Sequence, residues 1–272
     1  IDHHTQEVIH RVAGARSAED MMEQAWIALD PASNLQGIKE QYEAGEKNAE
    51  ALNLYISALR KAGMSSEIND VTAAWLEGLS NEEMMLEGNW KLLESNVSDP
   101  LSSPIQRVFA DRARFDEAIG EERVGKKLSS TLVFAVNRFR NKEPEPLPDF
   151  DQERFNALET FLSQVKDDAA ASCLAQLRVA GYAQHREYNK MIDALSRINK
   201  ENLVTGQFRT IFTLTYLTKL IGKKEVQKEA TALINEMISS ADNEQYKAYC
   251  YQIKGMMLES YGDEKGAAKA KE

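Results

Sequence analysis

The chain has 272 residues, of which 33 are basic and 43 acidic, so its formal net charge at pH 7 is −10. The length exceeds that of a common domain and predicts two domains or one long repeat array. Negative charge over most of the surface would repel a polyanion, which argues against nucleic-acid binding. No apolar run approaches the roughly 18 residues of a membrane-spanning helix, so we expect a soluble chain without a membrane span.

The opening segment differs from the rest of the chain. Residues 7–12 alternate in character and are rich in β-branched side chains, and the polar residues 3–6 before them can form a turn. This pattern predicts a β-hairpin that ends at Gly14. Ser17 is then expected to cap a helix that runs to Leu29, because acidic residues occupy its first turn and apolar residues follow at helical spacing.

Beyond Pro31 the strand signal disappears, and apolar residues recur three and four positions apart. Short runs that contain glycine or serine separate the segments. Connections this short favour antiparallel helix pairs. Helices are predicted over residues 34–44, 48–62, 65–79, 81–94, 104–119, 124–139, 151–165, 167–185, 188–198, 207–221, 224–239 and 244–261.

Three prolines in five positions mark a linker at residues 144–148, because proline neither continues a helix nor enters the middle of a sheet. This linker suggests where one helical subdomain ends and the next begins. We therefore divide the chain into residues 1–31, a first helical subdomain of residues 32–141, a proline-rich linker of residues 142–149 and a second helical subdomain of residues 150–272.

The last segment carries part of a known repeat pattern. Tyr251, Gly255, Leu258 and Ala267 match four positions of the tetratricopeptide repeat, in which a small residue lets two helices approach closely. Earlier segments have suitable helix-turn-helix lengths but lack the signature residues. We expect a mainly α fold of irregular antiparallel helix pairs, a tetratricopeptide-like α-solenoid preceded by a short β-hairpin and its helix.

The hairpin over residues 7–12, the small-residue step at residues 13–15 and the helix that Ser17 opens resemble the final strand pair and last helix of the thioredoxin fold. With the helical extension behind them, they are similar to secreted bacterial thioredoxin-like proteins with a helical C-terminal domain. The resemblance covers residues 1–31 and implies a periplasmic or otherwise extracytoplasmic location. It also implies that the C-x-x-C motif and the cis-proline would lie upstream of Ile1, so we expect no thiol–disulfide activity in this chain.

Few residues suggest chemistry. Cys173 and Cys250 lie in separate predicted helices without a C-x-x-C motif, and we expect them to be small buried apolar residues rather than a disulfide or redox pair. His3, His4 and His10 could approach one another in a hairpin. No cysteine or acidic ligand falls at a recognised spacing from them, so no metal site is predicted.

Catalytic motifs are also missing from the sequence. The paired acids Glu82–Glu83 and Glu121–Glu122 are interpreted as surface residues that complement the dipoles of helix N-termini. No nucleotide-binding, serine-hydrolase or zinc-protease motif occurs. We therefore predict no catalytic residue and no cofactor for this chain, and the sequence leaves open whether a parent protein is a thiol–disulfide oxidoreductase.

Aromatic residues in two predicted helices are the best candidates for a binding surface. Helical repeats bind peptides on a concave face, where aromatic side chains supply contact area. Packing between paired helices is the other interpretation of the same spacing. The candidates are Phe208, Phe212 and Tyr216 in one helix and Tyr246, Tyr249 and Tyr251 in the other.

These observations favour a protein-interaction region of a thioredoxin-like protein, with a protein or peptide as its partner. Two alternatives stay open. The helices could only cover or stabilise a disulfide oxidoreductase, or they could bind a small ligand or glycan in a groove lined by Trp75 or Trp90. The sequence does not indicate the partner's identity, the oligomeric state or the biological process.

Overall fold

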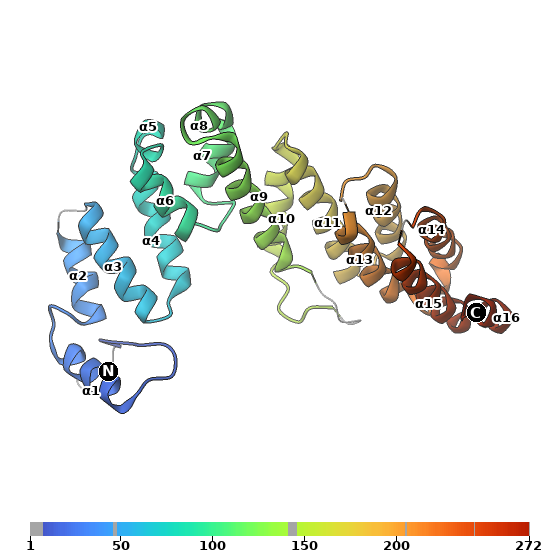
Figure 1. Cartoon of the computed structure of the whole chain (residues 1–272), viewed down its shortest axis with the longest axis horizontal. Coiled ribbons are helices and arrows are strands. Elements are labelled where there is room, and N and C mark those ends of the chain that lie inside the picture. Colours follow the sequence, from blue (N-terminus) through green and yellow to red (C-terminus); the bar gives the residue numbers. More distant parts are fainter. Residues whose placement is uncertain (1–7, 46–47, 141–145, 205, 242, 272) are drawn as a thin grey trace. The chain divides into compact units, whose positions relative to one another are not determined.

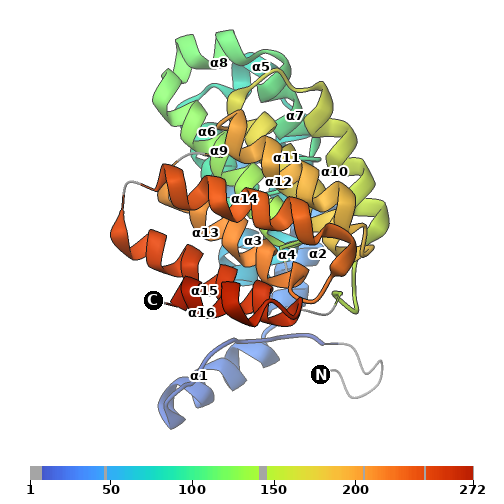
Figure 2. The ribbon, with the colours of Figure 1, turned by 90° about the vertical axis from the view of Figure 1, so that its right-hand side faces the viewer.

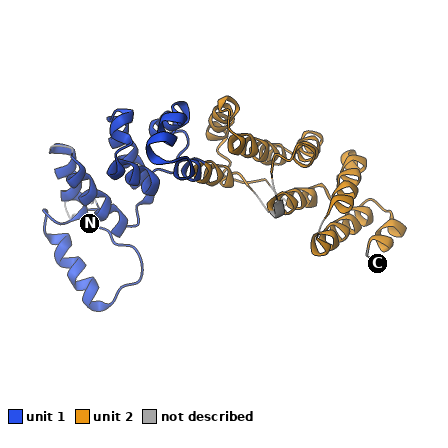
Figure 3. Ribbon diagram, turned by 45° about the horizontal axis from the view of Figure 1, so that its top comes forward, with its two compact units in different colours: residues 1–128 blue, residues 129–272 orange. Residues whose placement is uncertain are grey.

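The computed structural model describes residues 8–45, 48–140, 146–204, 206–241 and 243–271 (Figure 1). Within these ranges the chain forms helices and loops and no β-strand, which confirms the mainly α class. Contacts divide it into two compact units, residues 1–128 and 129–272 (Figure 3). The division falls within a helix, α9 (Glu121–Asn137), upstream of the proline-rich segment at which the sequence suggests a boundary. No helix of the described ranges is both long and apolar enough to cross a bilayer.

Unit 1 is built from helices that pack on their neighbours along the chain. Its core has two clusters of buried side chains, one centred on Leu52 and Leu59 and the other on Trp90 and Phe115. The helices of the unit are α1 (Ala18–Leu29), α2 (Leu35–Ala44), α3 (Ala49–Lys61), α4 (Ser65–Glu77), α5 (Asn81–Met84), α6 (Glu87–Asn96), α7 (Ser103–Ala110), α8 (Arg112–Ile119) and the first part of α9.

The prediction of a β-hairpin is not supported where it can be examined, since residues 8–13 form no strand. Their backbone groups pair with helix ends instead. Gln36 N, in the first turn of α2, donates to Ile9 O at 3.0 Å, and Ala13 N donates to Lys61 O, the last residue of α3, at 2.9 Å. Both helix groups lack partners within their own helices, so this segment satisfies them. The first half of the expected hairpin falls on residues 1–7, outside the described part.

Two long predicted helices are each divided. The segment 81–94 becomes α5 and α6 because Leu86 adopts an extended conformation, with φ −63° and ψ 135°. The amide of Asn89 then donates to Glu83 O at 2.8 Å and satisfies a carbonyl at the break. The segment 104–119 becomes α7 and α8, separated by Asp111 in a non-helical conformation.

Unit 2 begins in α9 and continues through further helices that again pack on their neighbours. It contains one helix, α16, that the sequence analysis missed, and a 3-10 turn where the start of the helix at Lys224 was predicted. The elements are α10 (Gln152–Gln164), α11 (Asp168–Gln184), α12 (Tyr188–Lys200), α13 (Gly206–Leu217), the 3-10 turns η1 (Thr218–Leu220) and η2 (Lys224–Val226), α14 (Gln227–Ser240), α15 (Glu244–Ser260) and α16 (Glu264–Lys271).

The contact of α10 with α11 depends on a glycine. A Cβ atom at Gly181 of α11 would lie 2.4 Å from Cζ of Phe155 in α10. The Phe155 ring has little room to move, because it is 6% exposed. Its centroid lies 5.5 Å from that of Phe139, which it meets edge to face, and 5.4 Å from that of Phe150. Gly181 therefore lets the two helices approach closely around this aromatic cluster.

A buried lysine joins α9 to the end of α6 in unit 1. Lys127 is 8% exposed, and its Nζ donates to Glu94 O at 3.0 Å and to Val97 O. These carbonyls lie at the C-terminal end of α6, where backbone acceptors lack helical partners and a cation is favoured. Burial lowers the pKa of Lys127 to about 8, and the charge of Glu94 partly opposes this shift.

We predict that Gly181→Ala lowers the free energy of unfolding by about 1–2 kcal/mol, because overpacking outweighs the better helix propensity of alanine. Urea unfolding followed by circular dichroism measures the change. Gly88→Ala in α6 is the control, since a Cβ there meets nothing within 4 Å; it should leave stability unchanged or raise it by up to about 1 kcal/mol. Equal effects of both substitutions would contradict the close contact with Phe155.

Lys127 should make stability depend on pH. Unfolded lysine has a pKa of about 10.4, so above about pH 8 the unfolded chain binds more protons at this residue than the folded chain does. The free energy of unfolding therefore decreases as pH falls through the folded pKa of Lys127 and increases again as pH rises. Compared with Lys127→Met, the unfolding free energy of the wild type should rise by about 2 kcal/mol between about pH 7 and about pH 10. A pH-independent difference would refute the lowered pKa.

Candidate functional site

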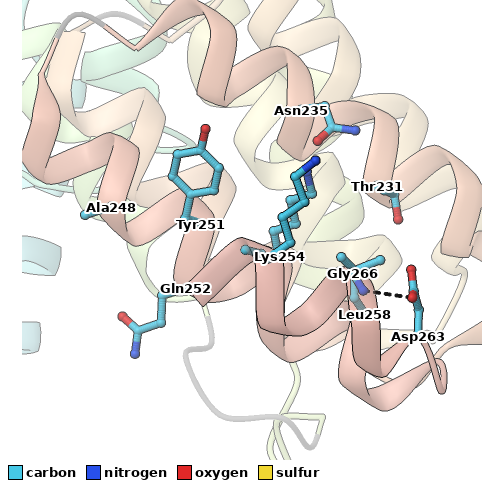
Figure 4. A pocket seen from close by; sticks show the side chains of 11 residues that line it. Thr231, Asn235, Ala248, Tyr251, Gln252, Lys254, Leu258, Asp263 and Gly266 are labelled. Carbon is cyan, nitrogen blue, oxygen red and sulfur yellow. Dashed lines mark hydrogen bonds between the residues drawn. The ribbon is translucent and has the colours of Figure 1, made fainter. Parts of the chain in front are cut away.

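A groove of about 910 Å³ is lined by α14, α15 and α16 (Figure 4). The central helix, α15, packs against both of the others, and Figure 2 shows α16 beside the end of α15. Many of the lining residues lie three or four positions apart on their helix and so share one face. They include Thr231 and Asn235 of α14, Tyr251, Lys254 and Leu258 of α15, and Lys269 of α16.

The turn between α15 and α16 follows from two residues of the sequence. Gly262 adopts a φ of +87°, which only glycine enters readily. Gly262 N then donates to Glu259 O at 3.0 Å and Asp263 N to Leu258 O at 2.9 Å, the hydrogen bonds of a Schellman motif. The Asp263 carboxylate accepts from Gly266 N at 2.9 Å and so caps the first turn of α16.

Small buried side chains let α16 lie close to α15. Gly255 of α15 is buried, and Ala267 and Ala270 of α16 are 3% and 7% exposed. Residues without long side chains allow two helix backbones to approach, which is the role that the tetratricopeptide pattern assigns to such positions. Leu258, which also matches that pattern, is 8% exposed and belongs to the groove lining.

Several polar groups of the groove have no protein partner among the described residues. No hydrogen bond or ion pair within the described ranges engages the side chains of Asn235, Tyr251, Lys254 or Lys269. In Figure 4 the Lys254 side chain extends from α15 toward Asn235 of α14. The one acidic residue of the lining, Asp263, already accepts a hydrogen bond from the first turn of α16. The groove therefore presents two ammonium groups, an amide and a phenol to a ligand.

The predicted aromatic residues divide into core and surface. Phe212 and Tyr216 are 1% and 2% exposed and belong to the core of unit 2, the packing role that their spacing left open. Phe208 is 40% exposed and lies under the guanidinium of Arg140, whose Cζ is 4.6 Å from the ring centroid. None of the three lines the groove.

The aromatic residues of α15 include one that lines the α14–α16 groove. Tyr251 is 37% exposed and lines the groove, so the structure brings it together with Lys254. Tyr249 is 47% exposed and Tyr246 is partly buried, and neither belongs to the lining. Of the six aromatic candidates, only Tyr251 lines the groove.

The residues that sequence reasoning missed are the polar ones. Lysines on helices are common on any surface, so Lys254 and Lys269 carry no signal by themselves. A usable signal was present nearby, because Gly262 followed by Asp263 is a helix stop and a new start. That pair predicts α16, and α16 supplies one side of the groove.

The two cysteines are buried and unpaired in separate helices, α11 and α15, as predicted. Burial raises the pKa of Cys173 to about 11 and also raises the pKa of Cys250. Both thiols therefore stay protonated near neutral pH, whereas nucleophilic attack on a disulfide requires a thiolate. Neither cysteine is placed to take part in thiol–disulfide exchange.

The described residues provide no group of three or more His, Cys, Asp or Glu side chains that could hold a metal ion. His10 Nε2 instead lies 3.1 Å from Gln24 Oε1, and His3 and His4 lie outside the described part. Trp75 and Trp90, the two candidates for lining a ligand groove, differ in their exposure. Trp90 is fully buried, whereas Trp75 lines a second groove in unit 1.

Comparison with known proteins adds no relative. No protein-family model, no curated protein and no solved structure matches this chain.

Proposed function

We propose that the chain is a protein-interaction region whose α14–α16 groove binds an acidic segment of a protein partner. The observation that carries this proposal is the pairing of Lys254 and Lys269 in one groove without an acidic partner among the described residues. Unpaired cations beside an apolar floor suit a chain segment in which carboxylates alternate with apolar side chains. Tyr251 and Leu258 supply the apolar contact, and Asn235 can accept or donate hydrogen bonds to the segment's backbone.

The groove is basic, whereas the chain as a whole has a net charge of −10. An acidic segment is repelled over most of an acidic surface, so a patch that holds two cations and one capping carboxylate offers it a place to dock. Each exposed ion pair contributes about 0.2–1 kcal/mol. Two such pairs help to select the segment and fix its position, while burial of apolar side chains supplies the rest of the affinity.

We also propose, from the sequence resemblance of residues 1–31, that this region belongs to an extracytoplasmic thioredoxin-like protein. The absence of a strand at residues 8–13 gives this proposal no support from the hairpin part of the resemblance. The support from the structure is that α1 has no buried residue and that Met22, Trp26 and Leu29 are 65%, 71% and 72% exposed. Figure 2 shows α1 set apart from its neighbours in unit 1. Apolar helix faces of this kind are normally covered, and the last helix of a thioredoxin fold packs on its sheet.

The groove can be tested with short fluorescent peptides that alternate Glu with Leu and Tyr and are amidated at the C-terminus. Matched peptides carry Gln or Lys in place of Glu. Two ion pairs of about 0.2–1 kcal/mol each predict that the Glu peptide binds about 2- to 30-fold more tightly than the Gln peptide, which fluorescence anisotropy measures. Lys254→Glu with Lys269→Glu should weaken the Glu peptide at least about tenfold, because each reversal replaces an attraction by a repulsion.

The control variant is Lys228→Glu with Lys265→Glu. These lysines are exposed on α14 and α16 but do not line the groove, so the net charge changes equally while the groove stays intact. The control should change affinity by less than about twofold. Equal weakening in both variants would show that the overall charge, and not the groove, attracts the peptide. Failure of every amidated peptide to bind would contradict recognition of acidic side chains.

A further inference from the structure

A second groove lies on unit 1, where α2, α3 and α4 meet. It encloses about 630 Å³ and is lined by Tyr42, Tyr55 and Trp75, one aromatic residue from each of the three helices. The rings of Tyr42 and Tyr55 lie 5.2 Å apart between centroids and are inclined by 33°. Both tyrosines are anchored in the core at 7% and 8% exposure. This arrangement gives the groove a rigid aromatic wall.

The rest of the lining is acidic. Glu43, Glu67 and Asp70 contribute carboxylates, and none of the described residues that line the groove is basic. Glu43 lies 3.9 Å from Lys39 in an exposed ion pair. Among the described residues, the Asp70 carboxylate accepts one hydrogen bond, from the side-chain amide of its neighbour Asn69 at 3.1 Å. The Glu67 carboxylate has no hydrogen bond or ion pair among these residues.

The acidic side chains lie close enough to the aromatic residues to affect them electrostatically. Burial raises the pKa of the Tyr55 hydroxyl, and the charges of Glu43 and Glu67 raise it further. An electron-rich aromatic face beside uncompensated carboxylates attracts cations in two ways, through the ring quadrupole and through charge. Trp75 provides the most favourable ring for such a contact and is only partly buried. Its indole Nε1 donates to Asn89 at 3.5 Å, which holds the ring in place.

Arginine is the side chain that fits both features. Its planar guanidinium stacks on an aromatic face and at the same time donates to carboxylates in a forked geometry. Lysine can satisfy the charge but stacks less well, because its ammonium is compact and strongly hydrated. The groove is open to solvent and can accommodate an extended chain segment.

We propose that the α2–α4 groove docks an arginine-bearing segment of a protein partner, with the guanidinium over Trp75 and facing Glu67 and Asp70. The site is independent of the α14–α16 groove, which takes carboxylates. The chain therefore holds two docking grooves of opposite charge preference, one in each unit.

The test uses fluorescent peptides that alternate Arg with Leu and Tyr, together with matched Lys and Gln versions, on the full chain. Anisotropy should rank affinity as Arg above Lys above Gln, with at least a tenfold difference between Arg and Gln. Glu67→Gln with Asp70→Asn should weaken the Arg peptide at least fivefold. Trp75→Phe keeps an apolar ring but reduces the attraction to a cation, and it should weaken the Arg peptide about threefold while leaving the Gln peptide unchanged.

Glu77→Gln with Glu122→Gln is the matched control, because both residues are exposed in unit 1 and lie outside the groove. This control changes the net charge by as much as Glu67→Gln with Asp70→Asn does. It should leave affinity within twofold of the wild type. Thermal melts show whether each variant is folded. If the Glu67→Gln, Asp70→Asn double variant does not fold, Asp70→Asn alone replaces it. Equal affinity for the Arg and Gln peptides would overturn the proposal, and so would equal weakening by the groove and control variants. Equal affinity for Arg and Lys would overturn the stacking on Trp75.

Discussion

The close packing of α16 on α15 is the contact on which the proposed binding site depends. Gly255, Ala267 and Ala270 are buried and small, so the two backbones can approach while Lys254 and Lys269 stay in the groove. The turn at Gly262 and the cap from Asp263 set the direction in which α16 leaves α15. Without this arrangement, the lysines would be ordinary surface residues. The proposed partner-binding role thus rests on the small residues that position the charged ones.

Much of the fold could be predicted because apolar residues recur at helical spacing along the chain and several helices begin with a side-chain cap. Ser17 caps α1 and Ser80 caps α5, because each side chain accepts a hydrogen bond from the backbone, and the cap at Ser17 was predicted from the sequence. The breaks at Leu86 and Asp111 could not be predicted in the same way. They interrupt helical periodicity without a proline or glycine, and long-range partners such as the hydrogen bond between Asn81 and Asp111 stabilise them.

Binding surfaces were harder to predict than helices, for a related reason. Phe212 and Tyr216 have the spacing of a contact surface, but the same spacing builds a core, and only the packing of unit 2 distinguishes the two. Lys254 gains its significance from α14 and α16, elements that no local pattern around it reveals. The same holds for Trp75, which becomes a candidate only when Tyr42 and Tyr55 lie beside it. The two proposed docking grooves are each formed by residues from three helices, so neither can be recognised before its helices are assembled.

The most direct test is to map amide chemical shifts of the isotopically labelled chain while the acidic peptide and then the arginine peptide are added. The account predicts that the acidic peptide shifts resonances around Asn235, Lys254 and Lys269, and that the arginine peptide shifts a separate set around Tyr55, Glu67 and Trp75. Shifts of the same residues by both peptides, or shifts spread evenly over the surface, would contradict the existence of two selective grooves.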